Sequence, residues 1–297
     1  MPKGRRSISG LPGRTTARLT AERQRSDGQA LTETDPAKPQ HLTTEYAAQF
    51  GDEEVAAAYR HRPPYPAETF AILEPLLGLH PRCVLELGAG SGDFTVGLVP
   101  RVDHLIAVEP SRSMLERAVH RDGAVGAHVE WLAIAAEDYA FDRRYSAVVA
   151  AEAFHWLDWH AVLPRIADSL VPGGHLILVE RTLVEPLPWE PDLRVLIREY
   201  SSNQDYVPYD TVTELEARGL ITVSGRAQTK AMSYRQPVDS YVESFHSRNG
   251  FSRARMQAGR AQEFDDKLKA LLCRYCPDDT VRLAVQARIV WGRPVAM

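Results

Sequence analysis

The chain has 297 residues, 44% of them hydrophobic, which suffices for one or two domains with a sizeable core. A formal net charge of -4 disfavours a general nucleic-acid or membrane surface, and no apolar run approaches the roughly 20 residues that span a bilayer. The three cysteines do not suggest a disulfide framework, and the CxxC of Cys273 and Cys276 lacks two further zinc ligands at suitable spacing. We therefore expect a cytoplasmic monomer or homodimer without a bound metal.

Residues 1–40 differ in composition from the rest of the chain. Arginine and lysine are mixed there with Ser, Thr, Gly and Pro, and apolar residues are few. Such a segment cannot bury enough surface to offset the conformational entropy lost on ordering. Its Arg-rich, acid-poor start also resembles a transit peptide, but Gly10, Pro12 and Gly13 interrupt any amphipathic helix. We predict a disordered tail.

Residues 43–80 show helical patterns on either side of RHRPPYP, where consecutive prolines force an extended backbone. From residue 83 to 180, strand and helix patterns then alternate. Ser111 and Asp158 are suited to cap the helices that follow two of the strands. The alternation predicts a parallel sheet with helices on both faces. The strands are expected at 83–87, 104–110, 128–134, 145–154 and 173–180.

Past residue 181 the pattern is less regular, and we see no internal repeat. Residues 221–234 partly alternate polar and apolar positions and predict one strand, and residues 280–292 predict another. Helices are expected in 188–202, 238–248 and 254–275.

The stretch VLELGAGSGDF places Gly88, Gly90 and Gly92 between the first strand and a helix. Glycines at such a point let the backbone approach a ligand where a Cβ would clash. A dinucleotide loop has the pattern GxGxxG and aims a helix N-terminus at a pyrophosphate, but Asp93 occupies the last position here and would repel it. Glu86, ahead of the loop, suits a cationic ligand instead.

Two further acids stand near the ends of the next strands. Glu109 closes the second strand, 17 residues after Gly92, where a carboxylate can accept hydrogen bonds from both ribose hydroxyls. Glu137 follows the third strand and can receive an adenine amino group. A ligand with an ammonium, a sulfonium, a ribose and an adenine but no phosphate fits these acids. S-adenosyl-L-methionine meets this description.

Residues 43–181 resemble the class I S-adenosylmethionine-dependent methyltransferases. The resemblance rests on VLELGAGSGDFT, VEPSRSML, AAEDYAF, YSAVVAAEAFHWLD and LVPGGHLILVE, in this order and spacing. It implies a Rossmann-like α/β fold: a seven-stranded, mostly parallel sheet with helices on both faces, an antiparallel last strand, N-terminal lid helices and a C-terminal helical insert. It also implies that the cofactor-binding residues are Tyr59, Arg62, Glu86, Gly88, Ala89, Gly90, Gly92, Glu109, Pro110, Met114, Ala136, Glu137 and Ala151.

The same resemblance assigns roles to several of these residues. Glu86 and the glycines would line the methionine end of the cofactor, Glu109 would hold the ribose, and Met114 would pack on the adenine. Tyr59 would close over the cofactor and Arg62 would meet its carboxylate. Alternatively, the segment from Tyr59 to Pro66 is a rigid elbow between two helices.

The segment AEAFHWLDWH follows the fourth strand, at the edge where ligands of such sheets bind. Enzymes that methylate nucleic-acid amines place Asn- or Asp-Pro-Pro-Tyr there, so its absence disfavours DNA or RNA as the acceptor. FHW resembles a small-molecule subgroup that includes enzymes acting on aconitate-like carboxylic acids. His155 is the candidate catalytic base, unless it caps the following helix or bonds a neighbouring strand, and Trp156 either walls the acceptor or belongs to the core.

Residues 182–279 are expected to select the acceptor, with Tyr200, Tyr241, Phe245 and His246 as substrate-binding candidates. Alternatively, these aromatic residues only pack the helices onto the sheet. The chain is thus divided into a tail (1–40), a cofactor-binding core with lid helices (41–181), and substrate-recognition helices with the last two strands of the same sheet (182–297).

The leading hypothesis is a methyltransferase acting on a small molecule of specialised metabolism. O-methylation of a carboxylate or hydroxyl comes first, and C- or N-methylation of an aromatic or heteroaromatic molecule comes second. A base is needed only where the acceptor is protonated at the working pH. The alternative of another class is a regulator or scaffold that keeps the cofactor pocket but has lost catalysis.

Overall fold

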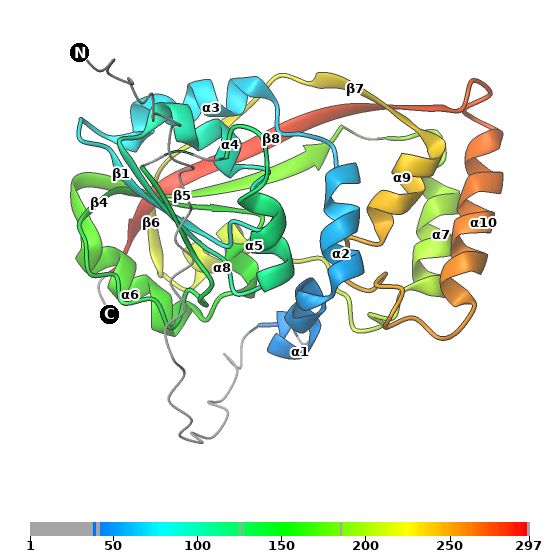
Figure 1. Ribbon diagram of the computed structural model, residues 1–297, viewed down its shortest axis with the longest axis horizontal. Helices are drawn as coiled ribbons and strands as arrows, with labels where there is room; N and C mark the ends of the chain where they lie inside the picture. The colour runs from blue at the N-terminus through cyan, green and yellow to red at the C-terminus, as the bar shows by residue number, and fades with distance from the viewer. Residues whose placement is uncertain (1–37, 40–41, 125, 127, 185, 296–297) are drawn as a thin grey trace, which may run out of the picture.

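The computed structural model describes residues 38–39, 42–124, 126, 128–184 and 186–295. The tail predicted at 1–40 lies almost wholly outside the described residues. Figure 1 shows a twisted sheet with its helices on one side of the molecule and a group of helices, α7, α9 and α10, on the other. None of the helices in these ranges is both long and apolar enough to cross a membrane.

Five parallel strands form one half of the sheet, in the order β3-β2-β1-β4-β5. The predicted α/β class and parallel core are confirmed. The last of these strands begins at Leu170 rather than at the expected residue 173, because Leu170 already pairs with Tyr145. The bounds are β1 (Cys83–Leu87), β2 (His104–Val108), β3 (Val129–Leu132), β4 (Tyr145–Ala151) and β5 (Leu170–Leu183).

The other half of the sheet is antiparallel and is built around β8 (Thr280–Pro294). One edge of β8 pairs with β5, and the other pairs with β6 (Ile221–Gln228) and then β7 (Met232–Pro237). The described residues thus form eight strands, not the expected seven. The single strand predicted at 221–234 is wrong because the chain breaks its ladder at Thr229, whose hydroxyl accepts the Ala287 N–H at 3.0 Å.

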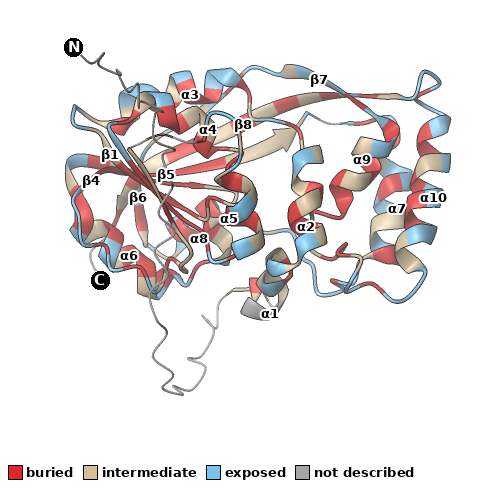
Figure 2. Cartoon of the chain, viewed as in Figure 1, coloured by how far each residue is buried: buried red, intermediate tan, exposed pale blue. Residues whose placement is uncertain are grey.

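Alternation along the strands sends apolar side chains to two helical layers. Leu85 and Val148 belong to a core that includes α6 and α8, whereas Val84 and Ala147 belong to a core that includes α3 and α4. Figure 2 shows the central strands β1, β2 and β4 as almost continuously buried, as expected where a sheet is covered on both faces. The helix α8 was not expected from the sequence. The bounds are α3 (Ala67–Leu73), α4 (Thr95–Leu98), α5 (Arg112–Ala118), α6 (Trp159–Ser169) and α8 (Thr211–Ala217).

The two predicted helix caps are present in the structure. The Ser111 hydroxyl accepts the Met114 N–H at 3.2 Å and begins α5. Asp158 Oδ1 accepts the N–H groups of His160 and Ala161 at 2.9 and 3.3 Å and begins α6. Both caps satisfy backbone donors that a helix start leaves unpaired, so they fix where the loops after β2 and β4 end.

A second apolar core lies among α7 (Glu190–Tyr200), α9 (Val238–Phe245) and α10 (Arg260–Cys273), against β7 and the first part of β8. The last of these helices begins at Arg260, six residues after the start expected from the sequence. Gly259 precedes it with φ +78°, a left-handed conformation that a continuous helix cannot contain. Short helices α1 (Thr44–Ala47) and α2 (Glu53–Ala58) connect this group with the sheet (Figure 1).

Candidate active site

A cavity of about 310 Å³ opens at the carboxyl edge of the parallel strands, between the sheet and the N-terminal helices. We call it the crevice. Its floor comes from β1, β4 and β5 and from the loops after β1, β2 and β4, and its roof includes Ala47, Ala48, Phe50 and Gly51. Trp156 contributes a further wall, and its ring centroid lies 5.3 Å from that of Phe50. The crevice therefore occupies the position where open parallel sheets bind their ligands.

The glycine loop lines the crevice with bare backbone. Gly88 has φ +71°, and a Cβ at this position would lie 2.5 Å from the Ala153 Cβ. Gly90 has φ +55°, and a Cβ there would meet no described atom within 4 Å. The first glycine is thus required for close packing behind the loop. The second leaves open space on the crevice side, as a ligand that contacts main chain requires.

Glu109 ties the end of β2 to this loop. Its Oε2 accepts the Gly90 N–H at 2.9 Å, and its Oε1 accepts the Ser111 N–H at 2.9 Å. Burial raises the pKa of Glu109, although both backbone donors act to lower it. The carboxylate is held in one orientation beside the crevice, and each oxygen keeps a lone pair that can accept a further hydrogen bond.

Glu86 is a buried carboxylate with an unsatisfied oxygen. It is 1% exposed, lines the crevice, and its Oε2 has no hydrogen-bond partner among the residues that the structure describes. Burial raises its pKa to about 8. An orphaned buried acceptor of this kind is stabilised by a cationic donor. The ammonium group of S-adenosylmethionine is such a donor, so the crevice fits this cofactor.

Glu152 is a site residue that the sequence reasoning missed. It follows β4 with φ +53°, a conformation that costs a non-glycine residue on the order of 1–2 kcal/mol and that clusters at functional sites. Its Oε1 accepts the Arg181 N–H at 2.9 Å and its Oε2 lies 3.2 Å from Arg181 Nη2. Burial acts to raise the pKa of Glu152, but Arg181 and Arg62 hold it below its usual value. Its place directly after the fourth strand was the signal that could have found it.

Two arginines line the crevice beside Glu152. Arg181 donates to the Pro63 carbonyl, and its guanidinium lies 4.7 Å from the centre of the Tyr65 ring. Arg62 donates to the Ser247 hydroxyl at 2.7 Å and to the Ser247 carbonyl at 2.5 Å, and its guanidinium lies 4.1 Å from the Tyr59 ring. Arg62 therefore links the segment after α2 to the segment after α9.

The roof is attached on two sides. On the sheet side, the Ser111 hydroxyl donates to the Phe50 carbonyl at 2.8 Å. On the side of the second core, Gln49 Nε2 donates to Asn249 Oδ1 at 2.7 Å, and Arg255 Nε lies 2.9 Å from Asp52 Oδ2. The last two contacts join segments about 200 residues apart in the sequence, and together with the first they hold the roof over the crevice.

Most of the predicted cofactor residues line the crevice, but three do not. Gly92 lies behind the loop, where a Cβ would come within 3.3 Å of the Ala118 Cβ. Ala136 is buried in the core that includes α6. The Glu137 carboxylate accepts the Asp158 N–H at 2.8 Å, which places it at the start of α6. Those that line the crevice are Tyr59, Arg62, Glu86, Gly88, Ala89, Gly90, Glu109, Pro110, Met114 and Ala151.

His155, the predicted catalytic base, is not itself a lining residue, although Trp156 and Leu157 are. It lies in a short 3-10 helix, Phe154–Trp156, and its ring centroid is 5.0 Å from that of Trp156. Its charge acts on Glu152, where it contributes to lowering the carboxyl pKa. His155 therefore stands beside the crevice, behind the residues that line it.

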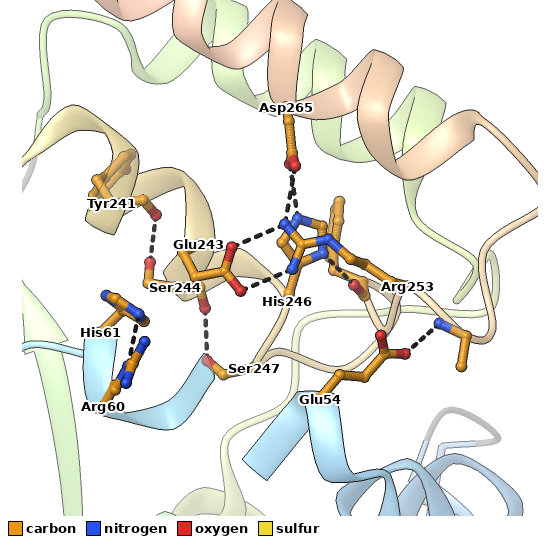
Figure 3. Close-up of polar contacts among 12 residues, drawn as sticks. Glu54, Arg60, His61, Tyr241, Glu243, Ser244, His246, Ser247, Arg253 and Asp265 are labelled. Carbon is orange, nitrogen blue, oxygen red and sulfur yellow. Dashed lines mark hydrogen bonds and ion pairs between the residues drawn. The ribbon is translucent and has the colours of Figure 1, made fainter. Parts of the chain in front are cut away.

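The structure does not place Tyr200, Tyr241, Phe245 and His246 in the crevice; the three aromatic residues pack in the second core. His246 is 1% exposed, with Nδ1 2.7 Å from the Phe251 carbonyl and Nε2 2.7 Å from Asp265 Oδ1. Figure 3 shows His246 and Arg253 converging on Asp265. Because His246 is buried and both of its ring nitrogens face acceptors of the protein itself, the structure gives it a structural role in place of the predicted contact with the substrate.

Comparison with known proteins gives the same class as the crevice. Residues 84–174 match a family model described as a methyltransferase domain. An uncharacterized methyltransferase of Mycobacterium tuberculosis (strain ATCC 25618 / H37Rv) is 40% identical over 143 residues, which are 48% of this chain and 56% of that protein. An uncharacterized methyltransferase-like protein of Schizosaccharomyces pombe is 30% identical over 142 residues, 47% of this chain and 54% of that protein. The chain thus spans a little over half the length of these relatives.

A solved structure from Anaeromyxobacter dehalogenans, described as a type II methyltransferase, is 22% identical with a TM-score of 0.54. The match covers 78% of this chain and 97% of that one, and it shows the shared fold. Residues 84–174 thus match a methyltransferase domain, and the chain shares the fold of a solved methyltransferase structure. The cofactor of this domain is S-adenosylmethionine.

Proposed function

We propose that the protein transfers a methyl group from S-adenosylmethionine to a small-molecule acceptor. The observation that carries the proposal is the meeting, in one crevice, of a bare glycine loop, an anchored carboxylate at Glu109 and an unsatisfied carboxylate at Glu86. The roof supports a small acceptor, because it encloses the crevice from above. The net charge of -4 gives no support to a nucleic-acid acceptor.

Each group of the cofactor has a proposed partner in the crevice. Glu86 would accept the ammonium, the backbone of Gly88 and Gly90 would border the methionine part, and Glu109 would accept the ribose hydroxyls. Met114 would pack on the adenine, with Tyr59 closing over the nucleoside. When bound, the sulfonium supplies a methyl group already activated for in-line attack. The chain therefore needs only to align the acceptor and exclude water, which Phe50 and Trp156 are placed to do.

Oxygen is the favoured acceptor atom, as in the small-molecule subgroup that includes the aconitate methyltransferases. A carboxylate attacks without a base, whereas a hydroxyl needs a proton acceptor, the role proposed for His155. We also propose that residues 41–181 hold the cofactor and that residues 182–297 contribute the acceptor side. The contact of Arg62 with Ser247 supports this division, because it brings the second segment to the crevice.

The test is transfer of labelled methyl groups to a metabolite library, run together with calorimetric titration of S-adenosylhomocysteine. Cofactor binding together with a labelled small-molecule product is the expected result. If the product forms on carbon or nitrogen, the assignment to oxygen is wrong. If S-adenosylhomocysteine binds but no acceptor is labelled, the chain is better described as a cofactor-binding regulator or scaffold. If S-adenosylhomocysteine does not bind, the whole proposal fails.

A further inference from the structure

The charged residues along the carboxyl edge of the sheet change sign from one side to the other. In the order of the strands, Glu109 follows β2, Glu86 lies in β1, Glu152 follows β4 and Arg181 lies in β5. The acids at β2 and β1 suit the cationic cofactor. Arg181 already neutralises the charge of Glu152. On the side of the crevice beyond β4, the positive charges therefore outnumber the negative charges.

Three guanidinium groups gather on this side, from Arg62, Arg181 and Arg248. Arg62 and Arg181 line the crevice, and both face Glu152, at 3.7 and 3.2 Å between nitrogen and oxygen. Asp93, a further carboxylate of the crevice, is paired with Arg121 at 2.5 Å. Arg62 and Arg181 thus share one carboxylate, and Arg248 adds a third positive charge near them, an arrangement that a bound anion would stabilise.

Arg248 is the member of this group whose donors are not used. In the described part of the chain its guanidinium makes no hydrogen bond or ion pair, and it lies over the Phe245 ring, 4.0 Å from guanidinium carbon to ring centre. Burial is the main cause that lowers the pKa of Arg248, and the like charges of Arg62 and Arg181 add to it. A half-buried guanidinium has five N–H donors, and it ordinarily pairs with an acceptor.

Arg248 is not itself among the residues that line the crevice, but its neighbours in the chain place it next to the crevice. It lies between Ser247, which accepts two hydrogen bonds from Arg62, and Asn249, which accepts one from Gln49 of the roof segment. Both of its neighbours are therefore fixed to residues beside or above the crevice. Its planar fork is suited to an oxyanion, either a carboxylate or a phosphate.

We propose that Arg248, together with Arg62, binds an anionic group of the acceptor, so that the substrates are carboxylate- or phosphate-bearing small molecules. This inference rests on the proposed function, since it concerns the acceptor side of the same crevice. Glu152 then acts as a positioning residue that pairs with Arg181 and so keeps this guanidinium away from the acceptor's anionic group. The cofactor carries one carboxylate of its own, so the test must separate that group from an anion of the acceptor.

The first measurement is calorimetric titration of S-adenosylhomocysteine into the wild-type protein, Arg248→Gln and Arg248→Lys. Arg274→Gln is the matched control, because Arg274 pairs with Asp192 on the surface and is 62% exposed. All four proteins are expected to bind S-adenosylhomocysteine with affinities within about twofold of one another. A tenfold or greater loss for Arg248→Gln alone would overturn the proposal, because Arg248 would then serve the cofactor carboxylate.

The second measurement titrates succinate and inorganic phosphate, at constant ionic strength, into the same proteins saturated with S-adenosylhomocysteine. Saturable binding of at least one probe is expected for the wild type and for Arg274→Gln, with a tenfold or greater loss in Arg248→Gln and a smaller loss in Arg248→Lys. The tighter probe identifies the anionic group. Equal binding by wild type and Arg248→Gln, or no saturable binding by either, would overturn the proposal.

Circular dichroism of each variant shows whether it is folded, and Arg248→Lys preserves the test if Arg248→Gln does not fold. If no protein binds S-adenosylhomocysteine, the proposed function fails. The anion titrations without it then still decide whether Arg248 is an anion site.

Discussion

Arg181 holds both oxygens of Glu152, one through its backbone N–H at 2.9 Å and the other through its guanidinium at 3.2 Å. Since Arg181 is 8% exposed at its side chain, Glu152→Gln would leave a buried cation without its counter-charge. We expect the free energy of unfolding to fall by about 2 kcal/mol. Chemical denaturation measures it, with Glu130→Gln as the control because the Glu130–Arg143 pair is exposed. Equal losses in both variants would show that the Glu152–Arg181 contact contributes no more to the free energy of unfolding than an exposed ion pair does.

The glycine loop predicts opposite outcomes for two similar substitutions. Gly88→Ala places a Cβ 2.5 Å from another Cβ and should destabilise the fold by about 3 kcal/mol. In Gly90→Ala the new Cβ meets no described atom within 4 Å, so the free energy of unfolding should fall by only about 1 kcal/mol, because of the positive φ. The methyl group would, however, enter the crevice. Melting temperatures and titration of S-adenosylhomocysteine compare the two. Undiminished affinity in a folded Gly90→Ala protein would contradict the proposed position of the cofactor.

Glu109→Ala should weaken binding of S-adenosylhomocysteine by about 10- to 100-fold, the loss expected for two hydrogen bonds to a charged group. The change removes the proposed ribose acceptor and also the anchor of the Gly90 and Ser111 N–H groups. Isothermal titration calorimetry measures the affinity. Glu116→Ala is the matched control, since Glu116 is exposed on the neighbouring helix α5. An affinity equal to that of the control would remove Glu109 from the cofactor site.

The raised pKa of Glu86 predicts that the stability of the cofactor-free protein depends on pH. Burial raises its pKa from 4.5 to about 8, so between these values the native state keeps a proton that the unfolded chain has released. Its contribution to stability is therefore full below about pH 4.5 and is lost as the pH rises toward 8. Glu86→Gln removes this titration, and its melting temperature should fall less between pH 5 and 8. Thermal melts at four pH values test this, and parallel curves for the two proteins would contradict it.

His155→Ala should lower turnover of a hydroxyl acceptor by about 100-fold, the usual contribution of a general base, and leave affinity for S-adenosylhomocysteine within about twofold. Turnover of a carboxylate acceptor should be little changed, because no proton is removed. His160→Ala, on the outer face of α6, is the control. Rates for a hydroxyl acceptor that match the control would leave His155 with a structural role only.

Local patterns in the sequence were enough to predict much of the fold and of the cofactor side. The parallel strands are nearly continuous apolar runs, and Ser111 and Asp158 cap helices through contacts two or three residues away. Glu86 and the glycines form one contiguous motif at the end of β1, and Glu109 stands at the end of the next strand, β2. Each of these features depends on neighbours in the chain, so it can be read before the fold is known.

The residues that sequence reasoning misplaced depend on contacts between distant segments. Tyr241 and Phe245 are aromatic, as a pocket wall often is, but they pack in the second core, where Phe245 contacts both Tyr241 and Phe264. In the sequence Arg181 looks like any strand residue, because only the pairing of β4 with β5 brings its partner Glu152 beside it. The break at Thr229 is likewise set by its partner on β8. No spacing along the chain reports such pairings.

The long strand β8 has a consequence for any attempt to shorten the chain. It covers β5 from Leu176 to Leu183 on one edge and carries β6 and β7 on the other. A fragment that ended near residue 181 would leave Leu176, Ile177 and Leu178 on an open edge, with unpaired N–H and C=O groups ready to recruit a second copy. Such a fragment should aggregate, although it would contain the whole glycine loop.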